Sequence, residues 1–173
     1  MKLQKALNII KRSPSISLWR DESSGTQLLS NGYAAYDVSS WPFIETQEEL
    51  AAILGIDDMD KHSFSIGEIP DICRSRNDGI PADRKYITIC QDGSERTFLD
   101  ANGKIIAVNP KYLSPFDEEA LYEYIDCDDG EIIAVGGFIK DGYVLPQSPD
   151  QKYKAALEEI YRGLWNEIFK IFT

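Results

Sequence analysis

The sequence has few of the residues that build metal centres, disulfide frameworks or membrane spans. Of its 173 residues, one is a histidine and three are cysteines, Cys73, Cys90 and Cys127, which form no CxxC pair. An odd number of widely spaced cysteines predicts neither a zinc site nor a disulfide framework, and it favours a reduced, cytoplasmic setting. No apolar run approaches about 18 residues and the N-terminus lacks the apolar core of a signal peptide, so we expect no membrane span and no secretion.

Sequence motifs of catalysis are missing as well. No GxSxG, P-loop or GxGxxG stretch occurs, and a Ser/His/Asp or Cys/His arrangement could be built only around His62. Asp57, Asp58 and Asp60 precede His62, but one imidazole with loop carboxylates is a weak metal signal. We therefore expect no enzymatic activity, no cofactor and no metal. Paired-carboxylate hydrolysis stays open, because spacing in the sequence does not give spacing in the fold.

Positive charge is scarce and unevenly distributed. The chain has 18 Lys and Arg against 29 Asp and Glu, a formal net charge of −11. Residues 1–50 are nearly neutral, whereas segment 117–131 holds eight acids and no basic residue. This balance argues against coating of nucleic acid by bulk charge, although it leaves room for a local basic surface. We interpret segment 117–131 as a solvated acidic face, because it fails the spacing of a calcium-binding EF-hand loop.

Local patterns predict short helices and hairpins along the chain. Asn31-Gly32 between apolar runs is typical of a tight hairpin turn. Thr46 and Glu49 form a capping box at the start of a helix. In the first half of the chain we expect a helix over 2–12, strands over 16–19, 26–29 and 33–38, a helix over 46–55, and a long loop over 56–83 with room for one helical turn. In the second half we expect strands over 85–90, 96–99 and 104–108, a helix over 109–125, a hairpin of 132–139 and 143–145, and a helix over 149–172.

This order of elements indicates the fold class. Hairpins dominate and alternating βαβ units are missing, so we expect an α+β fold with a mainly antiparallel sheet and helices packed on one face. Residues 1–147 are expected to form one domain. Residues 148–173 are expected to add a C-terminal amphipathic helix that packs on the same domain.

Three stretches carry a family resemblance. Lys104 to Leu113 reads KIIAVNPKYL, a strand that runs into a helix, and Ile133 to Pro146 reads IAVGGFIKDGYVLP, a hairpin that ends in Leu-Pro. With the strand and turn of Leu28 to Tyr33, they are similar to a domain of the bacterial DNA polymerase III β sliding clamp. The resemblance covers residues 1–147. It implies a clamp-like domain without enzyme chemistry, with two helices on one face and sheets on the other. In that family the helices carry positive charge and line a ring around DNA.

The chain departs from that family in three respects. Clamp rings contain several such domains, and this chain has room for one. The acidic helix expected after Asn109 would repel phosphate. The helix expected over 149–172 has no counterpart at the end of a clamp domain. Encircling of DNA therefore does not follow from the resemblance, even if the fold does.

Two surfaces are candidates for binding. The first is basic, and its residues are expected to contact nucleic acid: Lys2, Lys5, Lys11, Arg12 and Arg20. As an alternative, the same side chains form an ordinary solvated helix face. Arg74 and Arg76 form a weaker basic candidate. The second surface is the C-terminal helix, whose apolar stripe is wider than a surface helix needs. That helix either packs as core or docks a partner or a second copy, with these anchors: Trp165, Phe169 and Phe172.

We therefore expect a non-catalytic clamp-like domain for protein or nucleic-acid interaction. Its expected partner is DNA or a replication-type protein, its expected self-association uses the C-terminal helix, and its expected source is a phage or a mobile element. The alternative is an acidic protein-binding module that imitates the charge of DNA through segment 117–131. The first hypothesis predicts salt-dependent DNA binding, and the second predicts one contiguous negative surface.

Overall fold

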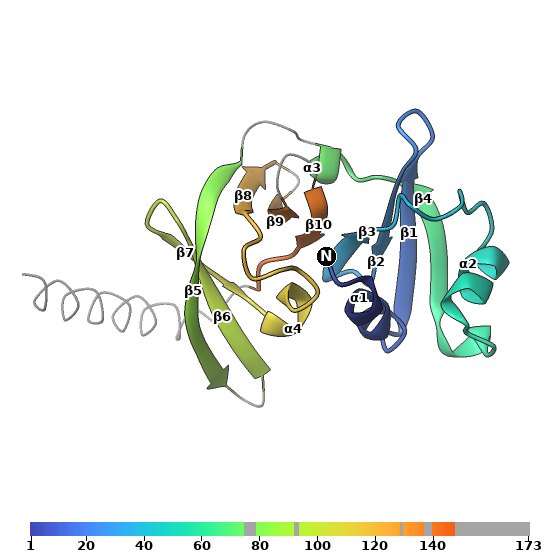
Figure 1. Cartoon of the computed structure of the whole chain (residues 1–173), viewed down its shortest axis with the longest axis horizontal. Helices are drawn as coiled ribbons and strands as arrows, with labels where there is room; N and C mark the ends of the chain where they lie inside the picture. The colour runs from blue at the N-terminus through green and yellow to red at the C-terminus, as the bar shows by residue number, and fades with distance from the viewer. Residues whose placement is uncertain (75–78, 92–93, 129, 137–139, 148–173) are drawn as a thin grey trace, which may run out of the picture.

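The protein is built on one large β-sheet. The computed structural model describes residues 1–74, 79–91, 94–128, 130–136 and 140–147. Within them a ten-stranded sheet, mixed but mostly antiparallel, confirms the α+β class, with the strand order β4-β1-β2-β3-β10-β9-β8-β5-β6-β7 (Figure 1). The strands are β1 (Ser15–Asp21), β2 (Thr26–Ser30), β3 (Ala34–Asp37), β4 (Ser63–Glu68), β5 (Ile80–Gln91), β6 (Ser94–Ala101), β7 (Lys104–Val108), β8 (Tyr122–Cys127), β9 (Gly130–Gly136) and β10 (Lys140–Val144).

Short helices cover both faces of this sheet. They are α1 (Leu3–Ile10), α2 (Gln47–Leu54), the 3-10 helix η1 (Met59–Lys61), α3 (Asp71–Arg74) and α4 (Pro110–Leu113). Buried residues of α1, α2 and α4 belong to the larger core cluster, and Cys73 of α3 belongs to the smaller one. Neighbours along a strand point to opposite faces, as Leu29 and Leu28 of β2 do, so the two clusters lie on opposite faces of the sheet. The position of α3 departs from the expected packing of helices on one face.

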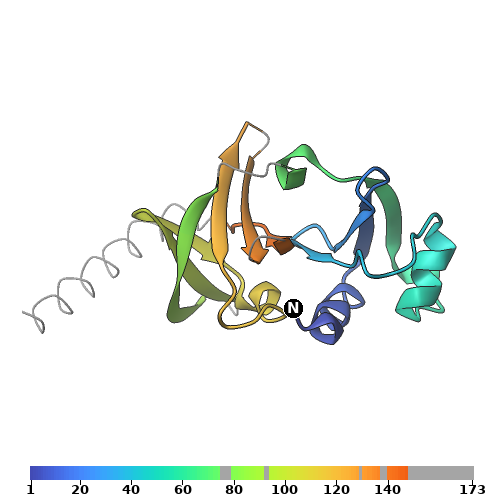
Figure 2. The same ribbon diagram turned by 45° about the horizontal axis from the view of Figure 1, so that its top comes forward.

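The same unit, a helix followed by a three-stranded meander, occurs twice. Helix α1 leads into the antiparallel strands β1-β2-β3, and α4 leads into β8-β9-β10. The last strands of the two units, β3 and β10, pair antiparallel through Tyr36 with Gly142 and Ala34 with Val144. The six consecutive strands β1-β2-β3-β10-β9-β8 therefore read first, second and third strand of a unit from either end. This arrangement places α1 and α4 side by side (Figures 1 and 2).

The β2–β3 hairpin forms as its turn residues predict. Gly32 has a φ of +83°, in the left-handed region that suits glycine. The Asn31 carboxamide oxygen accepts hydrogen bonds from the amides of Tyr33 at 3.1 Å and Ala34 at 3.0 Å. The other end of that carboxamide donates to Ser13 Oγ at 2.9 Å. Asn31 is buried, so this contact fixes the hairpin turn to the segment just after α1.

Strands β5, β6 and β7 bend away from the rest of the sheet and return to it. Strand β5 pairs with β8 at its start and with β6 along the rest of its length. The amide of Gln147, just after β10, donates to the carbonyl of Ala107 in β7 at 2.8 Å. Lys104 of β7 also forms ion pairs with Asp126 of β8 and Glu131 of β9. These contacts join β7, the last strand of the sheet order, to the chain just after β10 and to the β8–β9 hairpin.

Helix α2 begins and ends where the sequence predicts. Thr46 Oγ1 accepts a hydrogen bond from the Glu49 amide, and the Glu49 carboxylate accepts one from the Thr46 amide, each at 3.2 Å. Amide donors from Glu45 and Thr46 hold the pKa of the Glu49 carboxyl below its usual range. Gly55 then ends the helix with a φ of +65°. The capping box is therefore complete.

Removing the α2 cap should cause a small, measurable loss of stability. Thr46→Ala is expected to lower the free energy of unfolding by about 1 kcal/mol, because the Glu49 amide loses its acceptor. Thr46→Ser keeps an acceptor in the same place and is the matched control. Urea denaturation followed by circular dichroism measures both variants. Equal stability of the alanine and serine variants would show that the cap hydrogen bond contributes nothing.

Strand β4 lies in the region 56–83, where the sequence predicts a loop. It runs parallel to β1 along the outer edge of the sheet, with Phe64 beside Ile16 and Ile66 beside Leu18. Both Phe64 and Ile66 are half-buried and pack against the larger core cluster. The loop prediction is therefore wrong for these residues. The sequence favours a loop because the alternation of apolar and polar residues in β4 is short and is surrounded by Asp, Gly and Pro residues.

The helix expected over 109–125 is also wrong beyond its first turn. It ends at Leu113 as α4, and strand β8 starts at Tyr122. Tyr122 and Tyr124 are both buried in the larger core cluster, which is the two-residue period of a strand. The expected acidic helix is therefore absent from this part of the chain. The C-terminal helix expected over 149–172 lies outside the described residues.

Candidate nucleic-acid interface

The exposed side of α1 carries positive charge in an otherwise acidic protein. Its helical period turns Ala6 and Ile10 into the core and leaves Lys5 on the solvent side. Arg12, just after the helix, is also exposed. The first acid of the chain is Asp21, so no negative side chain belongs to α1 or its flanking residues.

Two of the predicted basic residues have neighbours within the protein. The ammonium of Lys2 lies 4.0 Å from a carboxylate oxygen of Asp117, and both side chains are exposed. The ammonium of Lys11 lies 4.0 Å from the position that a Cβ on Gly55 would take, at the C-terminal end of α2, where the helix dipole favours a cation. In the described part of the chain no carboxylate lies within ion-pair distance of Lys5 or Arg12. As far as the described residues go, these two cations are left to pair with an external anion.

Arg20 is not brought to this surface. It lies near the end of β1, five residues beyond Ser15, which is roughly 17 Å along a strand. Its guanidinium donates to the carbonyl of Ile44 at 2.7 Å and lies 5.0 Å from the centre of the Phe43 ring. Arg20 thus holds the segment that leads into α2, and its role in nucleic-acid binding stays a prediction.

Two tyrosines and a lysine that sequence reasoning missed lie beside α1. The rings of Tyr33 and Tyr112 stack with their centres 5.7 Å apart and their planes at 13°. Tyr112 is buried, whereas Tyr33 is 56% exposed. The ammonium of Lys111 lies 5.3 Å from the centre of the Tyr112 ring. In the sequence, the only local sign of the Tyr33–Tyr112 stack is that an aromatic residue, Tyr33, directly follows a predicted hairpin turn.

Helix α4, which carries Tyr112, is short but firmly held. Asn109 caps it by accepting a hydrogen bond from the Lys111 amide at 2.9 Å. The buried hydroxyl of Tyr36 in β3 donates to the Tyr112 carbonyl at 3.2 Å. Leu113 is fully buried in the larger core cluster. The Tyr33–Tyr112 stack therefore stands on a fixed support.

Three segments far apart in the sequence meet at this surface. The Lys2 amide donates to the Pro115 carbonyl at 2.6 Å, which joins the start of α1 to the chain just after α4. The Asn31–Ser13 hydrogen bond joins the hairpin turn to the segment just after α1. Lys5 and Arg12, the exposed ring of Tyr33, and Lys111 consequently belong to neighbouring elements, and we call these four side chains the α1–α4 surface.

The acids of segment 117–131 are divided among several places. Four of them form ion pairs with nearby cations: Asp117 with Lys2, Glu123 with Lys140, and Asp126 and Glu131 with Lys104. The first of these acids lies in the loop after α4, and the last two lie at the far end of the β8–β9 hairpin. The division gives no support to one contiguous acidic surface in the described part of this segment.

The cluster around Lys104 joins β7 to the β8–β9 hairpin. Its ammonium contacts the hydroxyl of Tyr124 and lies 2.9 Å from a Glu131 oxygen, and the Tyr124 hydroxyl donates to Asp126 at 2.9 Å. Burial raises the pKa of Tyr124 to about 12. Hydrogen bonds from Tyr124 and Lys104, respectively, lower the pKa values of Asp126 and Glu131. At neutral pH the cluster thus holds a neutral phenol, a charged ammonium and two carboxylates.

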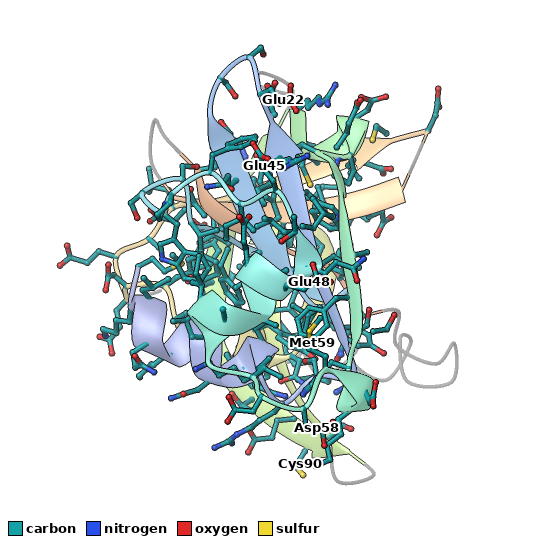
Figure 3. All side chains as sticks on the ribbon, turned by 90° about the vertical axis from the view of Figure 1, so that its right-hand side faces the viewer. Glu22, Glu45, Glu48, Asp58, Met59 and Cys90 are labelled. Carbon is teal, nitrogen blue, oxygen red and sulfur yellow. The ribbon has the colours of Figure 1, made fainter. Side chains whose placement is uncertain are left out.

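Other acids are exposed at the end of the molecule that carries α2. Figure 3 views this end and shows Glu22, Glu45, Glu48 and Asp58 around α2 and the edge of the sheet. All four are exposed. This end therefore exposes several acids, one of which, Asp58, forms an ion pair with Lys61.

The residues around His62, a weak metal signal in the sequence, form no ligand cluster in the part of the chain that the structure describes. The ring of His62 lies 2.8 Å from the carbonyl of Ser13 through Nδ1. Among the described residues no group of three or more His, Cys, Asp or Glu side chains could hold a metal ion. Cys73 is buried, and burial raises the pKa of its thiol to about 12. Cys73 therefore packs as a small apolar residue.

The remaining predicted sites fall on the parts of the chain without a structural description. The expected interface anchors Trp165, Phe169 and Phe172 lie outside the described residues, and so does Arg76. In the described part, no helix has the length and apolar character that crossing a membrane requires. Comparisons with protein-family models, curated proteins and solved structures gave no significant match to this chain.

Proposed function

We propose that the chain is a non-catalytic, clamp-like domain that binds nucleic acid through the α1–α4 surface. One observation carries the proposal: two neighbouring helices each lead into a three-stranded meander, and the meanders join through β3 and β10. The resemblance to a sliding-clamp domain implies two helices on one face of a sheet. Its stretch 104–113 covers β7 and α4, and the described parts of its stretch 133–146 belong to β9 and β10. Arrangement and resemblance support the same proposal.

Phosphate contact is the chemistry that this surface supplies. Lys5, Arg12 and Lys111 are exposed cations from α1, its flank and α4. Lysine and arginine contacts to phosphate position a nucleic acid without reading its sequence. Three such contacts give a slope of roughly −3 when the logarithm of the binding constant is plotted against the logarithm of salt concentration for a duplex. We therefore expect modest, sequence-independent binding that is strongest at low salt.

Reversing one charge of α1 tests the proposal. Arg12→Glu is expected to weaken binding about tenfold at low salt and to make the salt slope shallower by about 1, because one phosphate contact is lost and a repulsion is added. Lys5→Glu should act in the same direction. Fluorescence anisotropy with a labelled 20-base-pair duplex and a labelled 20-base single strand measures both effects.

Arg74→Glu is the matched control. It makes the same substitution and the same change in net charge, but on α3, which covers the opposite face of the sheet (Figure 2). The ion pairs of Arg74 with Glu68 and Asp71 involve exposed side chains and contribute little to stability. We expect less than a twofold change in affinity. Equal effects of Arg12→Glu and Arg74→Glu, or no binding of either probe by the unmodified protein at low salt, would contradict the proposal.

A further inference from the structure

The exposed ring of Tyr33 is a feature that phosphate contact does not explain. The hairpin turn of Asn31 and Gly32 places Tyr33 directly before β3, and its ring lies flat on the ring of Tyr112. One face of the Tyr33 ring is thus covered. With 56% of the residue exposed, the other face is open to solvent.

Two cations belong to the elements that hold this ring in place. Lys111 precedes Tyr112 in α4 and holds its ammonium 5.3 Å from the centre of that ring. Arg12 precedes Ser13, whose hydroxyl accepts the hydrogen bond from Asn31 in the hairpin turn. The carbonyl of Tyr33 also accepts a hydrogen bond from the Leu145 amide of the β10 end at 2.9 Å. An exposed aromatic ring on a fixed support therefore lies in a turn next to the elements that carry Lys111 and Arg12.

We infer that the α1–α4 surface prefers single-stranded nucleic acid and that Tyr33 stacks on one of its bases. The inference rests on the proposed function and names its substrate class. Bases in a duplex already stack on each other, so only an unpaired strand can place a base on an outside ring. A surface that met duplex phosphates alone would need cations and no exposed ring.

The test compares two probes and three variants. Fluorescence anisotropy at low salt measures binding of a labelled dT20 strand and a labelled 20-base-pair duplex. The unmodified protein is expected to bind dT20 more tightly. Tyr33→Ala should weaken dT20 binding by about 5- to 100-fold, the range for loss of one stacked base, and change duplex binding less than about twofold. Tyr33→Phe keeps the ring and should bind both probes as the unmodified protein does.

Tyr33→Leu separates stacking from apolar bulk. It keeps an apolar side chain over Tyr112 but has no flat face, so its dT20 affinity should fall as with alanine. It also replaces the alanine variant if that variant fails to fold. Tighter binding of the duplex, an unchanged dT20 affinity in Tyr33→Leu, or equal losses for both probes would overturn the inference.

The two proposals fail in different ways. If Arg12→Glu weakens binding while the Tyr33 variants do not, the proposed function stands and the preference for a single strand is lost. If the unmodified protein binds neither probe, both are lost.

Discussion

Gly142→Ala is expected to lower the free energy of unfolding by about 3 kcal/mol or to prevent folding. Gly142 is buried in β10, where it pairs with Tyr36 of β3 and with Val135 of β9. A Cβ at this position would lie 2.3 Å from the backbone oxygen of Ala35 and 3.0 Å from Cζ of Phe116. The nearer contact is with backbone, so no change of rotamer relieves it. Strands β3 and β10 would have to separate, and the two helix-and-meander units would lose their joint.

Gly67→Ala provides the control for that substitution. Gly67 lies in β4, and a Cβ there would meet no atom within 4 Å. Its expected change in unfolding free energy is within about 0.5 kcal/mol. Urea denaturation, followed by tryptophan fluorescence and circular dichroism, compares both variants with the unmodified protein. A loss below about 1 kcal/mol for Gly142→Ala would contradict the close approach of β3 and β10.

Elements whose signals act over a few residues could be predicted from the sequence. Asn31 bonds to amides two and three residues ahead of it, and Thr46 exchanges bonds with Glu49. Each of these side chains fixes the backbone of residues close to it in the sequence. The local sequence therefore determines the β2–β3 turn and the start of α2, and both could be predicted.

Elements that depend on distant partners could not be predicted in the same way. Lys140 to Gly142 predicts a hairpin turn because of its polar residues and glycine, and this prediction is wrong: the residues belong to β10, with an irregular register. The glycine is needed because β3 comes close, which no local pattern encodes. Likewise Tyr122 and Tyr124 fit either a helix or a strand until the partners of β8 are known.

The residues of the candidate site also differ in whether a local pattern or a distant partner determines their place. Lys5 and Arg12 follow from the amphipathic pattern of one helix. Arg20 is close to them in sequence only, because a strand carries it away from α1. Tyr33 and Tyr112 stack although they come from different units of the fold, so their contact has no sequence signal.

Leu113→Ala is expected to lower the free energy of unfolding by about 3 kcal/mol and to weaken binding to dT20. Leu113 is fully buried, and it anchors the four-residue helix α4 in the larger core cluster. Truncation leaves a cavity beneath Lys111 and Tyr112, and the support of the Tyr33 ring loosens with it. Urea denaturation and anisotropy on the same samples measure the two effects.

Leu121→Ala makes the same truncation eight residues later, at a side chain that is 64% exposed. Its expected effect on unfolding is within about 0.5 kcal/mol, and its effect on binding should be negligible. Comparison with Arg12→Glu distinguishes a residue that supports the surface from one that contacts the nucleic acid. Arg12→Glu should reduce binding and leave the stability unchanged, whereas Leu113→Ala should reduce both binding and stability. A Leu113→Ala protein that is less stable yet binds dT20 as tightly as the unmodified protein would place the nucleic acid on α1 alone. Binding that falls with the packing of α4 would instead make both helices part of one surface.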